Sequence, residues 1–424
     1  MDSLPFEVSS KIFRSALGTF SSQPQAFVAL RDIICCVSRT WRSVGLADAL
    51  LWRNVYVSPR INRDLIVLRL SRASTLPLVL YVLIQDDLDP SHPFYAWFTN
   101  TLGSSLPRTT ELFVVSPNLS SSVAIMMCLS LMTGTSLTLL HLDIRIPSVS
   151  DVLPGVVVPF SGMVVPIPFG GLMPALTRLS MRRTFLIWNS PPTYHGLQEL
   201  KLFHFPRAYL PPVVTIVDTI RSVPALTRLH LRGINCIGDI ISTHSRPILR
   251  HLTHLALFET SSGVVNLLQQ IDMPILHTLH IVFSESDYIA YGDIPLDSLF
   301  AGFTTAIVTV DSSNVNLVAG FLRRLRGVRR LDLRANTQQV AIAFHHMMFL
   351  DPRSVPELQC VLLPTFQPSD FVLQYFRRAD PLLSSYHLVF PSSWSEPFDL
   401  VEYFLQDKVP VHQNYFGSRN YWDN

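Results

Sequence analysis

The segment Pro224-Ala225-Leu226-Thr227-Arg228-Leu229-His230-Leu231 starts with a proline and spaces its leucines three and then two residues apart. Leu229 and Leu231 alternate with polar residues, as expected of a β-strand that is buried on one face. A single short strand cannot cover its own apolar face, so copies of the unit should stack beside it. The clearest copies are Pro174-Ala-Leu176-x-x-Leu179-x-Met181, Leu197-x-x-Leu200-x-Leu202, Leu252-x-x-Leu255-x-Leu257 and Pro274-Ile-Leu276-x-x-Leu279-x-Ile281.

Weaker copies occur on both sides of this region. From Leu176 onward the units recur at intervals of roughly 21 to 30 residues, which is typical of leucine-rich repeats with some irregular members. The downstream copies are Thr305-x-x-Val308-x-Val310, Val328-x-x-Leu331-x-Leu333 and Leu358-x-x-Val361-x-Leu363, and the upstream copies are Leu137-x-x-Leu140-x-Leu142, Thr109-x-x-Leu112-x-Val114 and Leu78-x-Leu80-x-Val82.

Segments between these strands carry apolar residues at helical spacing, for example Val213, Ile216 and Ile220. Alternating strands and helices predict an α/β fold with parallel strands on a concave face and helices on a convex face. We therefore predict an irregular leucine-rich-repeat solenoid, an open horseshoe, over residues 59–424. Residues 147–172 are rich in Pro, Gly and Val without either period, so we expect a long loop there.

The first fifty residues follow a helical pattern instead. Apolar residues from Leu4 to Leu17 recur mostly at four-residue steps, which predicts an amphipathic helix with Pro5 near its start. We expect small helices packed around tryptophans. After a break at residues 21–24, a second set falls on one helical face: Phe27, Leu30, Ile34, Val37 and Trp41.

This N-terminal pattern resembles the F-box-like family that is abundant in mushroom-forming fungi. The matching residues are Leu4-Pro5-x-Glu7-Val8-x-x-x-Ile12-Phe13, then Val37-Ser38-Arg39-x-Trp41-Arg42 and Leu51-Trp52. The resemblance implies a three-helix motif over residues 1–58 that binds a Skp-family adaptor and, through it, a cullin scaffold. Periodicity alone also allows these side chains to pack against the downstream domain. The contact residues that the resemblance implies are Leu4, Pro5, Val8, Ile12, Val37 and Trp41.

Side chains that alternate with the leucines face the opposite side of the sheet. They are basic and aromatic here, which suits an acidic or phosphorylated segment of a target protein. Arg can bind a carboxylate or phosphate through two parallel hydrogen bonds, and aromatic rings supply anchor area. The alternative is that a strand face open to water is polar in any case. The predicted target-binding residues are Arg178, Arg182, Lys201, Phe203, Arg228, His230, Arg232, Phe258 and His280.

Composition restricts the other function classes. Hydrophobic residues make up 48% of the 424 residues and charged residues 15%, so most of the chain should be packed. The net charge of +2 has no basic run that would indicate a nucleic-acid partner. Five cysteines without Cys-x-x-Cys spacing, and a start without a secretory signal, predict a cytoplasmic or nuclear protein. Residues 112–142 and 152–177 are uncharged, but their helix breakers argue against a membrane span.

Sequence signatures of catalysis are missing. We find no Walker loop, G-x-S-x-G, H-E-x-x-H or dinucleotide glycine fingerprint, and so expect neither enzyme activity nor a cofactor. The pairs His251/His254 and His345/His346 come nearest to metal-ligand spacing but have no Cys or carboxylate cluster beside them. Asp86, Asp87 and Asp89 are interpreted as a solvated turn rather than a cation site.

These patterns together predict a substrate-recognition adaptor of a Skp-cullin-F-box ubiquitin ligase. The F-box would dock the Skp-family adaptor, and the repeats would bind a target protein. Two alternatives remain: an interaction scaffold with no role in ubiquitination, and an enzyme whose site we do not recognise. Exposure of Leu4, Ile12, Val37 and Trp41 would favour docking, whereas a deep pocket with converging carboxylates or histidines would favour an enzyme.

Overall fold

The computed structural model describes residues 4–18, 24–132, 138–146, 168–171, 173–184, 194–204, 213–233, 248–258, 271–284, 304–311, 328–335, 360–362 and 387–389. The chain divides into two compact units, residues 1–209 (unit 1) and 210–424 (unit 2), and each is described by itself. Both units combine helices with parallel strands that follow one another in chain order.

Unit 1 begins with three helices, α1 (Phe6–Gly18), α2 (Pro24–Val37) and α3 (Arg39–Ala47), and the 3-10 helix η1 (Ala49–Trp52). Asp48 links α1 to η1. Its buried carboxylate accepts hydrogen bonds from the Ser10 hydroxyl and, at 3.1 Å, from the backbone N–H of Leu50, and it lies 3.2 Å from the Arg14 guanidinium. The apolar core of these helices includes Phe13, Leu17, Phe27, Ile34 and Val44.

The single helical face that we predicted from Phe27 to Trp41 is wrong. Ser38 ends the second helix and caps the third, because its hydroxyl accepts a hydrogen bond from the backbone N–H of Trp41 at 3.1 Å. Trp41 therefore lies on α3, where its ring contacts Phe13. Val37 is left exposed at the end of α2.

Six described strands of unit 1 form a parallel sheet: β1 (Asn54–Val57), β2 (Leu78–Leu83), β3 (Thr109–Val115), β4 (His141–Arg145), β5 (Arg178–Arg182) and β6 (Glu199–Phe203). Each strand pairs with its chain neighbours, so the sheet is open rather than closed. The register aligns two apolar rows whose members are at most 1% exposed: Val55, Leu80, Leu112, Leu142, Leu179 and Leu200, and Val57, Val82, Val114, Ile144, Met181 and Leu202.

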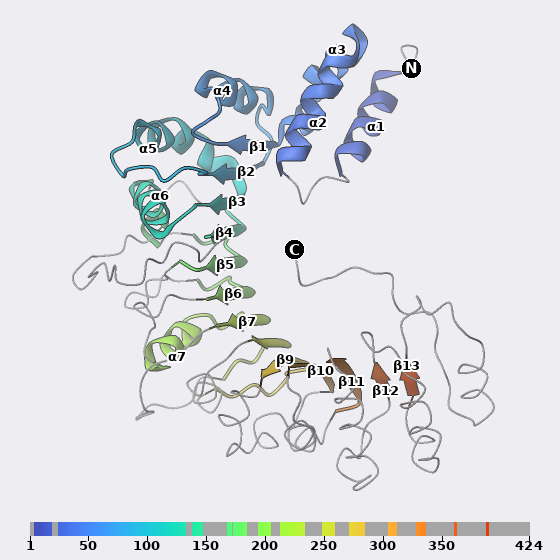
Figure 1. Ribbon diagram of the computed structural model, residues 1–424, viewed down its shortest axis with the longest axis vertical. Coiled ribbons are helices and arrows are strands. Elements are labelled where there is room, and N and C mark those ends of the chain that lie inside the picture. Colours follow the sequence, from blue (N-terminus) through green and yellow to red (C-terminus); the bar gives the residue numbers. More distant parts are fainter. Residues whose placement is uncertain are drawn as a thin grey trace, which may run out of the picture. The chain divides into compact units, whose positions relative to one another are not determined.

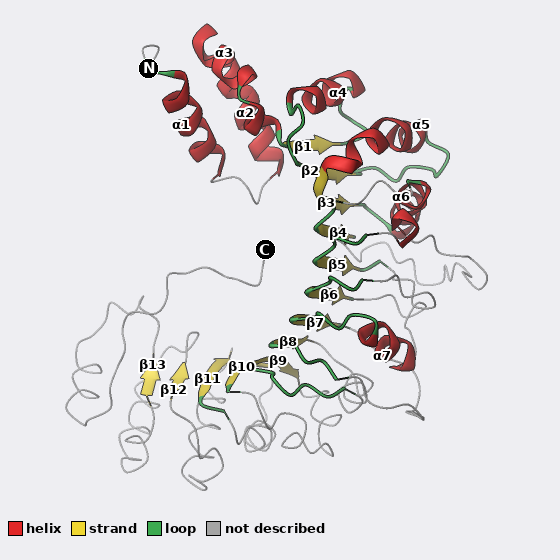
Figure 2. Cartoon of the chain, turned by 180° about the vertical axis from the view of Figure 1, so that it is seen from behind, coloured by secondary structure: helices red, strands yellow, loops and turns green. Residues whose placement is uncertain are grey.

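Helices cover this apolar side of the unit 1 sheet. They are α4 (Arg63–Arg72), α5 (Pro93–Trp97) with the turns η2 (Phe98–Leu102) and η3 (Gly103–Arg108), and α6 (Leu119–Leu131), and they lie on one side of the strands (Figures 1 and 2). A further turn, η4 (Pro168–Gly171), contacts α6. Burying one large apolar side chain stabilises a fold by about 1.5–3 kcal/mol, so the two rows hold the unit together.

Unit 2 also combines a helix with parallel strands. Helix α7 (Val213–Arg221) confirms the helix predicted from its apolar spacing, since Ile216 and Ile220 are buried. Its described strands are parallel and in chain order: β7 (Arg228–Arg232), β8 (His254–Phe258), β9 (Thr278–Ser284), β10 (Thr305–Asp311), β11 (Arg330–Ala335), β12 (Cys360–Leu362) and β13 (His387–Val389). The predicted α/β class with an open parallel sheet is thus confirmed and is compatible with a solenoid.

Two predicted repeat units were placed two residues away from their observed register. Leu142 pairs with Leu179, so the upstream unit begins at Leu139, which is 1% exposed, and Leu140 is exposed. Ala306 pairs with Leu279 and Val308 with Ile281, so the strand positions of the downstream unit are Ala306 and Val308 rather than Val308 and Val310. Within the strand, a two-residue slip keeps each side chain on its predicted face, which is why alternation alone could not detect it.

The observed segments differ from two of the predicted boundaries, at residues 1–58 and 147–172. The sheet begins at β1, inside residues 1–58 that we assigned to the helical motif. Of the loop predicted at 147–172, residues 147–167 and 172 lie outside the described residues, and 168–171 form η4. Within the described part of the chain, no helix is both long and apolar enough to cross a membrane.

Candidate functional site

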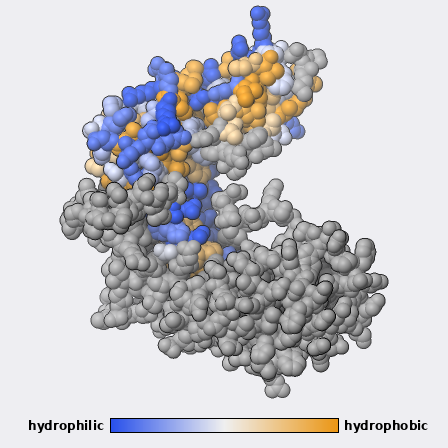
Figure 3. Space-filling view, in the orientation of Figure 1, coloured by the Kyte–Doolittle hydropathy of each residue, from blue (hydrophilic) through white to orange (hydrophobic). Residues whose placement is uncertain are grey.

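An apolar patch lies uncovered on the N-terminal helices. Phe6, Val8 and Ile12 of the first helix are 44%, 43% and 40% exposed, and Ile33 and Val37 of the second are 59% and 56% exposed. Leu4 and Pro5, just before α1, are exposed as well. Figure 3 shows hydrophobic side chains gathered over these helices. We call Leu4, Phe6, Val8, Ile12, Ile33 and Val37 the helical apolar patch; Trp41, the sixth predicted contact, is only half-exposed.

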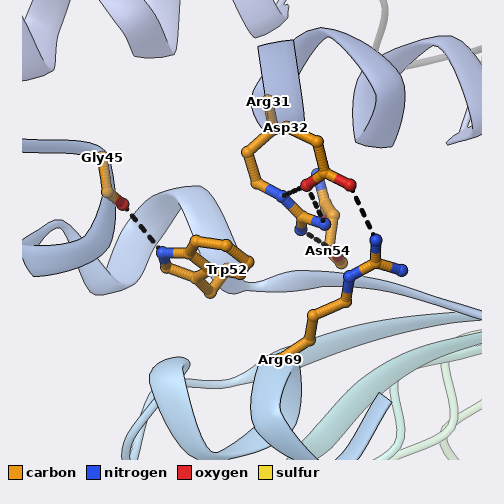
Figure 4. Close-up of polar contacts among 6 residues, drawn as sticks. All are labelled: Arg31, Asp32, Gly45, Trp52, Asn54 and Arg69. Atoms are coloured by element: carbon orange, nitrogen blue, oxygen red, sulfur yellow. Dashed lines mark hydrogen bonds and ion pairs between the residues drawn. The ribbon is translucent and has the colours of Figure 1, made fainter. Parts of the chain in front are cut away.

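A buried charge cluster ties these helices to the first repeat. The Arg31 side chain is 0% exposed, donates to Asp32 and to the backbone carbonyl of Asn54, and lies 4.2 Å from the centre of the Trp52 ring. The other oxygen of Asp32 accepts from Arg69 of α4 at 2.8 Å (Figure 4). Because both arginines share one carboxylate, α2 and α4 are held together through Asp32.

The second candidate surface is the face of the unit 1 sheet opposite the helices, which we call the open face. Its side chains alternate with the buried apolar rows. The rings of Tyr81 and Phe113 stack with centroids 4.9 Å apart and an angle of 8°, and the ring of His141 meets Phe113 edge-on at 4.8 Å. Its half-exposed or exposed members are Tyr81, Leu83, Glu111, Phe113, Val115, His141, Arg145, Arg178, Arg182, Glu199, Lys201 and Phe203.

Ion pairs link neighbouring side chains on the open face. Arg145 contacts both oxygens of Asp143, at 2.8 and 2.6 Å. Lys201 lies 3.1 Å from Glu199, and Arg178 lies 3.7 Å from Glu111. The face is therefore charged but internally paired.

Four of the predicted target-binding residues share this face: Arg178, Arg182, Lys201 and Phe203. The other five belong to unit 2, and there two expectations fail. His230 and His280 are 3% and 4% exposed, so neither offers an accessible side chain. Neighbouring strands lie about 4.8 Å apart, so a large side chain on the adjacent strand can enclose a ring in the middle of a strand. The ring of His280, for example, meets Phe258 of the adjacent strand with centroids 4.6 Å apart.

Sequence reasoning missed the part of the open face on β2, β3 and β4. Tyr81, Glu111, Phe113, His141 and Arg145 occupy the same alternating positions as the residues we did predict. The signal was present, because the degraded repeats upstream contain the same alternation.

The histidines and aspartates considered for metal binding do not converge. Among the described residues, no group of three or more His, Cys, Asp or Glu side chains could hold a metal ion. Asp86, Asp87 and Asp89 contact three different partners, Arg60, Asn118 and Ser91. His254 lies 2.8 Å from the hydroxyl of Thr253, His251 is exposed, and His345 and His346 lie outside the described residues.

The Glu111 carboxyl should make the stability of unit 1 depend on pH. His141, whose Nδ1 lies 3.6 Å away, and then Arg178 lower the pKa of Glu111 below its usual value. Its stabilising contribution should therefore be complete above the unfolded pKa of about 4.3 and be lost as pH falls through the lower folded value. The difference in unfolding free energy between wild type and Glu111→Gln should then be largest near neutral pH and shrink in acid. Denaturant titrations from about pH 7 to about pH 3 measure it, and a difference independent of pH would contradict the assignment.

Comparisons with known proteins add little. No protein-family model matches the sequence, and no curated protein matches it significantly. The chain is similar to the crystal structure of a Bacteroides fragilis protein from a structural genomics consortium, with 12% sequence identity and a TM-score of 0.36. The match covers 53% of this chain and 68% of that chain.

Proposed function

We propose that this chain is a substrate-recognition adaptor of a Skp-cullin-F-box ubiquitin ligase. The N-terminal helices would act as an F-box-like motif that docks a Skp-family adaptor. The parallel sheet would act as a leucine-rich-repeat domain whose open face binds an acidic or phosphorylated segment of a target protein. The chain would perform no bond chemistry and would instead hold a target near the ubiquitin-charged enzyme at high effective concentration.

The helical apolar patch is the observation that supports this proposal. Phe13 and Leu17 are 3% and 1% exposed on the same helix that leaves Val8 and Ile12 open. The helix thus has a core face and a second apolar face that the described part of the chain does not cover. Exposed apolar patches rimmed by polar residues often mark protein interaction sites. The patch therefore favours docking over the alternative that these residues pack on the downstream domain.

Co-purification with the Skp-family adaptor tests the docking role. We expect Val8→Asp/Ile12→Asp to abolish the complex, because each carboxylate would have to lose its water in an apolar interface. Lys11→Asp is the matched control, since Lys11 lies exposed on the same helix and its reversal changes the net charge by the same amount. Circular dichroism of all three proteins would establish that they remain folded.

The outcomes separate adaptor from scaffold. A complex that forms with wild type and Lys11→Asp but not with the double variant supports the proposal. The absence of a complex with wild type would leave an interaction scaffold without a role in ubiquitination. Equal loss in the control would show that net charge, not the helical apolar patch, governs the association.

A further inference from the structure

Three ion pairs on the open face share an asymmetry between their partners. The Arg145 side chain is 40% exposed and that of Asp143 only 3%. The values are 44% for Arg178 against 28% for Glu111, and 28% for Lys201 against 13% for Glu199. In each pair the carboxylate lies deeper and the cation lies nearer to solvent, so a partner approaching this face meets guanidinium and ammonium groups first.

An apolar strip lies next to these cations. Tyr81 and Leu83 on β2, and Phe113 and Val115 on β3, are half-exposed on the open face. Val115 pairs with Arg145 on the adjacent strand, and Glu111 is the register partner of His141. The apolar side chains on β2 and β3 therefore lie directly beside the cationic side chains on β4, β5 and β6.

We propose that this part of the open face binds an extended protein segment in which a large apolar side chain and a carboxylate are three to four residues apart. The apolar side chain would pack against Tyr81 and Phe113, and the carboxylate would bind Arg178. The inference gives the chemistry of the target and so rests on the target-binding half of the proposed function. It is independent of adaptor docking.

Sheet geometry sets the spacing in that segment. Phe113 and Arg178 are two strands apart and offset by two residues along the strands. With strands about 4.8 Å apart and about 3.3 Å per residue, their attachment points are roughly 12 Å apart. An extended chain advances about 3.3 Å per residue and covers this distance in three to four residues.

A single-stranded nucleic acid, which also uses rings and basic groups, fits this face less well. Nucleic-acid sites stack bases on open ring faces, but Tyr81 and Phe113 stack on each other. Every nucleotide also brings a phosphate, and Glu111 and Asp143 already neutralise the nearby cations. One carboxylate can share the outer N–H groups of an arginine with an existing partner, whereas a run of phosphates would be repelled.

Selection from a library of random 12-residue peptides, followed by fluorescence anisotropy of the enriched peptides, tests the proposal on the full chain. We expect enrichment of peptides in which an aromatic or large aliphatic residue and an Asp or Glu are three to four positions apart. Phe113→Ser should weaken binding about tenfold or more, as expected when a central anchor is lost. Arg178→Ser should weaken it about fivefold to tenfold by removing a charge-assisted hydrogen bond.

Two control variants make the same chemical changes elsewhere. Leu68→Ser removes an exposed apolar side chain from α4, and Arg39→Ser removes an exposed arginine from α3. Both should bind the enriched peptides as wild type does, and circular dichroism should show all variants folded. A labelled deoxythymidine oligonucleotide serves as the competing probe.

Each outcome decides for or against the proposed segment. Enriched peptides that need both Phe113 and Arg178 support it. No enrichment, enrichment of basic peptides, binding unaffected by the two variants, or tight oligonucleotide binding lost in Arg178→Ser would overturn it. Val8→Asp/Ile12→Asp should keep peptide binding, and Phe113→Ser should keep adaptor binding, so failure of one proposal can be told from failure of the other.

Discussion

Trp52→Ala should lower the free energy of unfolding by about 3–5 kcal/mol, the range for removing a large buried aromatic side chain. The Trp52 ring is 2% exposed and lies between two guanidinium groups, with Arg31 at 4.2 Å and Arg72 at 4.5 Å from its centre. Its indole N–H donates to the carbonyl of Gly45 at 2.8 Å. Alanine would leave a cavity, an unpaired carbonyl and a buried arginine without its ring.

Chemical denaturation measures this loss, and Trp97→Ala is the matched control. Trp97 carries a similar contact, with Arg63 at 5.8 Å from its ring, but it is half-exposed. We expect the control to cost clearly less. If the two variants lost the same free energy of unfolding, the contacts of Trp52 with Arg31 and Arg72 would contribute no extra stability.

Asp32→Ala should cost about 2–3 kcal/mol, somewhat less than the 3–5 kcal/mol for breaking a fully buried ion pair, because Asp32 is itself half-exposed. The variant removes the carboxylate that Arg31 and Arg69 share, and these side chains are 0% and 5% exposed. Burial lowers the pKa of Arg31 to about 10, which still leaves it charged at neutral pH. Two buried cations would then lose their shared counter-charge.

The matched control for that substitution is Asp218→Ala. Asp218 pairs with Arg221 on the surface of α7, and exposed pairs contribute about 0–1 kcal/mol. Thermal unfolding of the three proteins ranks the effects. If Asp32→Ala were no more costly than Asp218→Ala, the helices would not be held to α4 through this carboxylate.

The repeat strands were predictable because the alternation that identifies each strand lies within a few consecutive residues. Leu179 and Leu229 alternate with polar residues in segments short enough to be strands, and both are buried as expected. The register of a strand was harder to predict where the segment has more leucines than the repeat needs, or has a smaller residue at a leucine position. Leu137, Leu139, Leu140 and Leu142 offer two overlapping units, and Ala306 does not look like a leucine position although it is fully buried.

Contacts between distant segments could not be predicted in this way. Arg31 lies on a helix with ordinary apolar spacing, and its burial depends on Trp52, Asn54 and Asp32 meeting around it. The burial of His280 likewise depends on Phe258, which lies on the neighbouring strand β8. Alternation predicts which face a side chain points to, but exposure on that face is set by its neighbours across the sheet.

The open strand order has a consequence for how such a protein can change over time. Within unit 1 each strand meets only its predecessor and its successor, whereas a closed barrel would need every strand to complete its ring. Duplication or deletion of one whole repeat leaves all remaining pairings intact. Each such event lengthens or shortens the row of side chains that runs from Tyr81 through Phe113 to Lys201 by one position, so binding specificity can be altered in whole-repeat steps without a new fold.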